Sequence, residues 1–160
     1  IAPYRMNRVM VLLDQNKDPM GMGYQIKQAL IAVGSGGLFG AGLGMSNQKF
    51  GLIPQTVSDS IFAVFAEEMG FLGAGFLVLL FLIFLWQALK TAKNAPDQFS
   101  KLFAVGMASW ISLQAFINMG AMIGIVPLAG IPLPLVSYGG SHMVVELIGM
   151  GILLSISKRS

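Results

Sequence analysis

The sequence has 160 residues, of which 55% are hydrophobic and only 11% are charged, and it carries a formal net charge of +3 with no cysteine. Soluble domains carry about 25% charged residues, so this composition excludes a water-exposed globule. The lack of cysteine excludes disulfides and thiolate metal sites, and the small net charge predicts no nucleic-acid partner. Charged residues are absent from 69–86 and from 102–141. Stretches of this length can cross the roughly 30 Å hydrocarbon core of a bilayer as helices.

Residues 1–58 mix charged and apolar side chains and contain a turn signal at Asp18-Pro19. Apolar residues then recur at helical spacing: Ile26, Ala29, Leu30 and Val33. This pattern predicts an amphipathic helix at 24–33. We therefore expect residues 1–58 to form an outer loop with amphipathic segments, which lies on or dips into the membrane surface without crossing it.

Residues 59–160 contain three predicted membrane-spanning helices. The first covers 61–89 and has Trp86 near its end, where aromatic residues commonly mark the membrane interface. The second covers 102–126. The third opens at 137–141, after three prolines that break the chain, and ends near residue 156.

The charges of the short loops predict how these helices are oriented, because loops rich in lysine and arginine stay on the cytoplasmic side. Basic residues outnumber acidic ones in the hairpin at 90–101 and at the C-terminus: Lys90, Lys93, Lys101, Lys158 and Arg159 against Asp97. The loop at 127–140 has no charge. We therefore expect the hairpin and the C-terminus in the cytoplasm, with residues 1–58 and 127–140 facing outward.

Five polar residues lie inside the predicted spans, where lipid makes them costly: Glu67, Glu68, Gln114, Asn118 and Glu146. Gln114 and Asn118 are four residues apart on one helix face, which favours hydrogen bonds that hold the helices together. For Glu146, a packing role and a functional role in a wet cavity stay equally open. Glu67 and Glu68 point about 100° apart, so one of them can simply reach the interface.

Asp59 lies at the outward end of the first predicted span. The helix dipole there favours an ionised carboxylate, and an ionised carboxylate at the mouth of a cavity can act as a general base. Acidic residues are also common in the first turn of helices, where they only stabilise the helix. On the residues alone, this second interpretation is favoured.

A glycine-rich stretch at 34–44 invites comparison with a phosphate-binding loop. It lacks the lysine of a P-loop, and Phe39 stands where the dinucleotide-binding pattern has its third glycine. Gly36, Gly40 and Gly44 are instead four residues apart, a spacing that lets helices approach closely. His142 is the single histidine of a chain without cysteine, and we expect no zinc site.

Four sequence blocks resemble the SEDS family (shape, elongation, division and sporulation). They are the region 23–44, the block Ser46-Asn47-Gln48-Lys49, PQTVSDSIFAVFAEEMGFLGA at 54–74, and IPLPLVSYGGS at 131–141 with GILLSISKR at 151–159. The second block is more similar to the FtsW branch of the family than to the RodA branch. The resemblance covers nearly the whole chain. It implies an all-α, polytopic helical bundle in the membrane: the large outer loop and the last three spans of a ten-span protein.

The resemblance also implies a function. Members of this family polymerise lipid II into the glycan strands of peptidoglycan, outside the bacterial cytoplasmic membrane. They work with a class B penicillin-binding protein, which cross-links the strands, and with other membrane proteins of the division machinery. The essential loop aspartate of the family matches Asp59, which implies that Asp59 is the catalytic base. The neighbours differ, because Gln55, Val57 and Ser60 replace a glutamate, a histidine and a phenylalanine of the family.

The pyrophosphate leaving group of such a reaction needs positive charge. We expect this charge from Lys49 and Lys27 or from a divalent cation, while Glu67 and Glu146 complete the predicted substrate-binding residues. No other cofactor is expected. Two alternatives stay open. A flippase or transporter of lipid-linked precursors would also explain carboxylates and broken helices in the membrane, and a non-catalytic scaffold of the division machinery would need no active site.

Overall fold

The computed structural model describes residues 8, 10–12, 21–42, 44–45 and 60–159. This described part of the chain contains helices and no strand. Its long helices are α2 (Met22–Ser35), α3 (Ile61–Asn94), α4 (Gln98–Met122) and α5 (Gly140–Ser157). Three of them, α3, α4 and α5, are long and apolar enough to cross a membrane. The prediction of an all-α polytopic membrane protein is confirmed.

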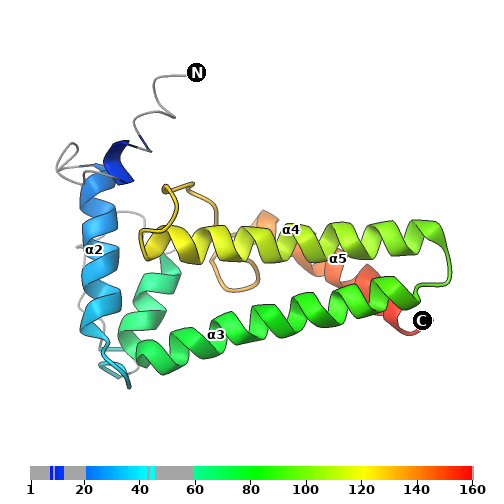
Figure 1. Ribbon diagram of the computed structural model, residues 1–160, viewed down its shortest axis with the longest axis horizontal. Helices are drawn as coiled ribbons and strands as arrows, with labels where there is room; N and C mark the ends of the chain where they lie inside the picture. Colours follow the sequence, from blue (N-terminus) through cyan, green and yellow to red (C-terminus); the bar gives the residue numbers. More distant parts are fainter. Residues whose placement is uncertain (1–7, 9, 13–20, 43, 46–59, 160) are drawn as a thin grey trace.

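Helices α3 and α4 form an antiparallel pair along the longest dimension of the molecule (Figure 1). Only residues 95–97 connect them, so the polar hairpin is shorter than predicted, and Lys90 and Lys93 belong to the last turns of α3. Asp97 begins α4 as its N-cap, and one oxygen of its carboxylate accepts a hydrogen bond from the backbone N–H of Ser100 at 2.8 Å. The predicted boundary of the second span at Leu102 is therefore four residues too late.

Helix α3 is not continuous, contrary to the single span predicted over 61–89. Gly70 has φ 68° and ψ −169°, which breaks the helix into a short first segment and a long second one. The first segment lies beside α2, across the end of the long helices, and the second runs along α4 (Figure 1). Glu67 and Glu68 therefore belong to the short segment, before the break.

The break is held by the backbone of the glycine-rich segment that follows α2. Phe71 N–H donates to Gly37 O at 2.8 Å, and Ala41 N–H donates to Glu67 O at 2.9 Å. These bonds satisfy peptide groups that the interrupted helix leaves without partners. The two backbones approach so closely that a Cβ on Gly40 would overlap the backbone carbonyl of Glu68.

The close approach expected from the glycine spacing is thus found, but its setting differs from the prediction. A Cβ on Gly36 would meet the backbone of α3 at Ala66, whereas a Cβ on Gly44 would have no heavy atom of the described chain within 4 Å. Helix α2 ends at Ser35, so these glycines lie in a turn and not along a helix face. A helix is excluded at these two positions because Gly40 and Gly44 both have positive φ.

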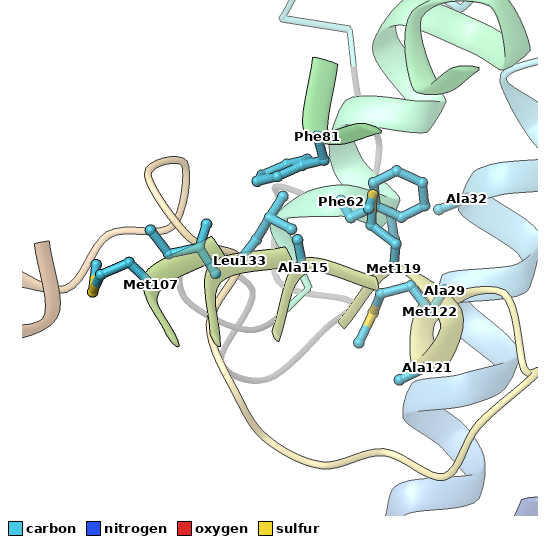
Figure 2. Packing of buried hydrophobic residues seen from close by; sticks show 12 residues of the cluster. Ala29, Ala32, Phe62, Phe81, Met107, Ala115, Met119, Ala121, Met122 and Leu133 are labelled. Carbon is cyan, nitrogen blue, oxygen red and sulfur yellow. The ribbon is translucent and has the colours of Figure 1, made fainter. Parts of the chain in front are cut away.

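The largest apolar core lies where α2, the first segment of α3 and the far end of α4 meet (Figure 2). Alanines on α2 and α4 let the helices come close, and Phe62, Met119 and Met122 fill the space between them. The amphipathic helix predicted at 24–33 is confirmed as α2. Its most buried residues are Ile26, Ala29 and Ala32, so the buried face is turned slightly away from Leu30 and Val33.

Candidate functional site

The loop between α4 and α5 turns back into the bundle. Leu133 and Pro134 are fully buried there, and Ser137 is only 5% exposed. A non-helical backbone at membrane depth is tolerated only where protein satisfies its N–H and C=O groups. The hydrogen bonds of this loop therefore explain the polar side chains that surround it.

Helix α4 and the N-terminal region provide donors for the carbonyl groups of this loop. Gln114 Nε2 donates to Pro132 O at 3.0 Å, and Asn118 Nδ2 donates to Ile131 O at 2.7 Å. Gln114 and Asn118 were predicted to hold helices together; they do have a packing role, but their partners are carbonyls of the loop and not another helix. Arg8 Nη1 adds bonds to the carbonyls of Leu128 at 3.0 Å and Ala129 at 3.3 Å, across 120 positions of sequence.

Helix α5 provides the acceptor for an N–H group of the same loop. The carboxylate of Glu146 is 1% exposed, and its Oε2 accepts a hydrogen bond from Leu135 N at 3.0 Å. Leu135 has φ 61°, a left-handed conformation that is uncommon for a residue other than glycine. Within the turn, Ser137 Oγ accepts a hydrogen bond from Leu133 N at 2.7 Å.

His142 links the two helices on either side of the loop. Its Nδ1 lies 3.2 Å from Glu146 Oε1, and its Nε2 lies 2.9 Å from Gln114 Nε2. Because the amide nitrogen of Gln114 can only donate, the network assigns Nε2 as the acceptor and places the ring proton on Nδ1. This makes a continuous chain of polar groups from α4 through His142 to Glu146.

The predicted site residues are not all within the described structure. Asp59 and Lys49 lie outside the described residues. Lys27 is exposed on α2, and Glu67 is 3% exposed on the short segment of α3. Glu146 lies on α5 and belongs to the loop network, whereas Lys27 and Glu67 lie on α2 and α3. Among the described residues, no three acidic, histidine or cysteine side chains gather in a way that could hold a metal ion.

Sequence reasoning missed His142 and Ser137 as members of this network. His142 and Glu146 are separated by four residues on α5, a spacing that places them on one helix face. This spacing could have predicted their contact. The hydrogen bond between Leu133 and Ser137 depends on how the loop folds back, and no pattern of residues predicts it.

Residues 1–160 match the family model described as cell cycle protein, which groups FtsW, RodA and SpoVE. The chain belongs to this family. It is 46% identical to stage V sporulation protein E of Bacillus subtilis over 99% of its own length and 43% of that protein. It is 45% identical to a probable peptidoglycan glycosyltransferase FtsW of Thioalkalivibrio sulfidiphilus, over 99% of this chain and 40% of the relative.

Solved structures agree with this assignment. A chain from a peptidoglycan synthase complex, described for its coordination of polymerization and crosslinking, superposes with a TM-score of 0.74 at 30% identity, covering 99% of this chain and 43% of that one. An aspartate-to-alanine variant of RodA, the rod shape determining protein of Thermus thermophilus, gives a TM-score of 0.61 at 33% identity, covering 81% and 39%. The chain spans about two fifths of the length of these relatives. It is part of a multi-pass protein of the bacterial cytoplasmic membrane.

Proposed function

We propose that the protein containing this chain is a peptidoglycan glycosyltransferase that polymerises lipid II. One observation supports this most directly: 99% of the chain aligns at 45% identity with a relative named as a probable enzyme of that kind. The fold agrees, because the three membrane-spanning helices and helix α2 superpose on a chain of a peptidoglycan synthase complex. The match covers 40% of the relative, so the proposal concerns the full-length protein.

In this proposal Asp59 is the general base. The 4-hydroxyl oxygen of the acceptor sugar attacks the anomeric carbon of the donor, and the bond from that carbon to the lipid pyrophosphate breaks. The pyrophosphate leaves with the electron pair, and Asp59 takes the proton of the hydroxyl. Asp59 directly precedes Ser60, the N-cap of α3.

The leaving pyrophosphate carries negative charge that must be stabilised in the transition state. We assign this role to Lys27 and Lys49 or to a divalent cation. Lys27 is exposed on α2, the helix that packs beside the first segment of α3 (Figure 1). Glu67 lies on that first segment, and a role for it in binding substrate stays a prediction. Glu146 has its two carboxylate oxygens near Leu135 and His142, which favours an indirect role through the loop.

The proposal also includes partners and orientation. A class B penicillin-binding protein would cross-link the strands, and other membrane proteins of division would accompany it. The α3–α4 connection and the C-terminus lie at the end opposite α2 (Figure 1). This arrangement agrees with the predicted orientation, in which residues 1–58 face outward as a loop, 59–160 hold the spans, and the C-terminus is cytoplasmic.

The decisive experiment measures polymerisation of lipid II by the full-length protein with its cross-linking partner. Asp59→Asn keeps the size of the side chain and removes its basicity. We expect polymerisation to fall by about 10²–10⁴-fold, the usual contribution of a positioned acid or base. Thermal stability and partner binding should be retained, which separates this result from misfolding.

Two results would contradict the proposal. Transfer of lipid II across vesicles without polymer formation would identify a flippase. Normal growth of cells that carry only Asp59→Asn, with a protein that never forms polymer, would identify a scaffold. Near-normal polymerisation by a folded Asp59→Asn protein would refute only the role of Asp59 as general base and would leave the proposed activity standing.

A further inference from the structure

Five basic residues gather at the end of the bundle formed by the α3–α4 connection and the C-terminus (Figure 1). We call this set the basic end: Lys90, Lys93, Lys101, Lys158 and Arg159. All five side chains are exposed. Asp97 is the one acidic residue in the hairpin or the tail. The basic end therefore carries a strong local excess of positive charge.

Asp97 offsets only one of these five positive charges, and its carboxylate is held in place by Ser100. Its two oxygens accept hydrogen bonds from the backbone N–H of Ser100 at 2.8 Å and from the Ser100 hydroxyl at 2.7 Å. The bonds from Ser100 lower the pKa of Asp97, and the positive charge of Arg159 lowers it further. The C-terminus lies at the same end of the bundle as the α3–α4 connection (Figure 1).

The basic end lies at the depth of lipid headgroups. From Phe71, after the break, to Lys90 the helix runs for about 30 Å, which equals the thickness of the hydrocarbon core. Trp86 is 65% exposed near this end, where tryptophans mark the interface. Lys90 Nζ lies 5.7 Å from the centre of the Trp86 ring. Lys93 is three residues further along α3.

Large apolar side chains lie next to the charges of the basic end. Phe99 is 76% exposed and Leu102 is 68% exposed, on either side of Ser100 and Lys101 in the first turns of α4. A surface that combines cations with exposed apolar groups suits an amphiphile with an anionic head and an apolar tail. An acidic segment of a soluble protein would leave these apolar groups uncovered.

We propose that the basic end binds the headgroups of anionic phospholipids such as phosphatidylglycerol. Lysine and arginine clusters beside a membrane-spanning helix attract anionic lipids by about 1 kcal/mol for each charge near the surface. The headgroup phosphate would contact the lysines, and the acyl chains would lie against Trp86, Phe99 and Leu102. This inference does not depend on the glycosyltransferase activity, because none of the residues proposed for that activity belongs to the basic end.

Native mass spectrometry of the full-length protein tests this inference directly. The protein is released from micelles that contain equimolar phosphatidylglycerol and phosphatidylcholine, and the ratio of retained anionic to zwitterionic lipid is measured. The test variant carries Lys90→Gln, Lys93→Gln and Lys101→Gln. Since 1 kcal/mol corresponds to roughly a fivefold change in a binding constant, we expect the ratio to fall up to about fivefold for each charge removed.

Two matched variants define the result. The same three positions changed to arginine keep the charge and should keep the ratio. Gln98→Ala changes an exposed neutral side chain at the same end, in the first turn of α4, and should leave the ratio unchanged. The proposal is overturned if the glutamine variant retains phosphatidylglycerol as well as the unmodified protein, if the arginine variant loses it equally, or if Gln98→Ala reproduces the loss. Equal melting temperatures confirm that the exposed substitutions leave the fold intact.

Discussion

The side chain of Glu146 accepts a hydrogen bond from the backbone N–H of Leu135 at 3.0 Å, and this contact joins α5 to the loop that turns back into the bundle. Leu135 adopts a left-handed conformation with φ 61°. Such a conformation persists in a residue other than glycine when its surroundings fix it. A carboxylate at this depth is therefore explained by the peptide group that it satisfies.

The contact predicts different effects of two substitutions at Glu146. Glu146→Ala leaves the N–H of Leu135 buried without its acceptor, and we expect a loss of about 1–3 kcal/mol in the free energy of unfolding. Glu146→Gln keeps an acceptor oxygen and should cost clearly less. Thermal unfolding of the full-length protein in detergent measures both. Loss of polymerisation in Glu146→Ala with an unchanged melting temperature would instead indicate direct substrate binding.

The break in α3 predicts that Gly40 tolerates no side chain. Gly40 has φ 84°, and a Cβ on it would overlap the backbone of Glu68. Alanine in a left-handed conformation costs at least about 1 kcal/mol, and the overlap adds to this, so Gly40→Ala should lower the melting temperature by several degrees. Gly75→Ala is the matched control, because nothing lies within 4 Å of its Cβ position. Alanine at this helical site should leave stability unchanged or raise it, and equal destabilisation by both variants would refute the explanation.

The orientation of the bundle can be tested with an impermeant thiol reagent on spheroplasts. Cysteines are placed at Asn94, the last residue of α3, and at Ala129, in the α4–α5 loop, in a cysteine-free background. Ala129 is preferable to its exposed neighbour Gly130, whose φ of 63° disfavours a side chain. We expect labelling at position 129 and none at 94 until the membrane is permeabilised. The reverse pattern would invert the proposed topology.

The cap of α4 predicts a pH dependence in the hairpin. Hydrogen bonds from Ser100, and then the charge of Arg159, hold the pKa of Asp97 below its ordinary value of 3.8. Because the folded pKa is depressed, the stabilisation is present above pH 3.8 and is lost as the pH falls through the lower folded value. Hydrogen exchange at the Ser100 amide should therefore lose protection only in that acidic range. In Asp97→Ala this amide should show the low protection at every pH. If its protection still changed with pH in the acidic range, the assignment of the effect to the Asp97 carboxylate would be wrong.

Much of this architecture could be predicted from the sequence. The long uncharged stretches indicated α3 and α4, and the prolines before residues 137–141 indicated where α5 begins. Gln114 and Asn118 were identified as packing residues because an amide in a membrane helix needs a partner. Their actual partners, the carbonyls of Pro132 and Ile131, depend on a loop that folds back. Proline spacing indicates that a helix ends, but it does not give the path that follows.

The break at Gly70 was missed for a related reason. A glycine inside an apolar run is usually tolerated within a helix, and Gly73 and Gly75 in the same run are helical. What distinguishes Gly70 is its contact with the turn after α2, which lies some 30 positions earlier in the sequence. The position of Asp59 at the end of the first predicted span made it a candidate, but only the family resemblance favoured a catalytic role, since acidic residues near helix starts are common for other reasons.

The inward path of the α4–α5 loop also shortens the helix that follows it. Helix α5 has 18 residues, which corresponds to about 27 Å, slightly less than a hydrocarbon core of roughly 30 Å. On this side of the protein, the bilayer either thins or meets loop residues at one of its surfaces. The loop thus gives α5 a small local hydrophobic mismatch with the surrounding bilayer.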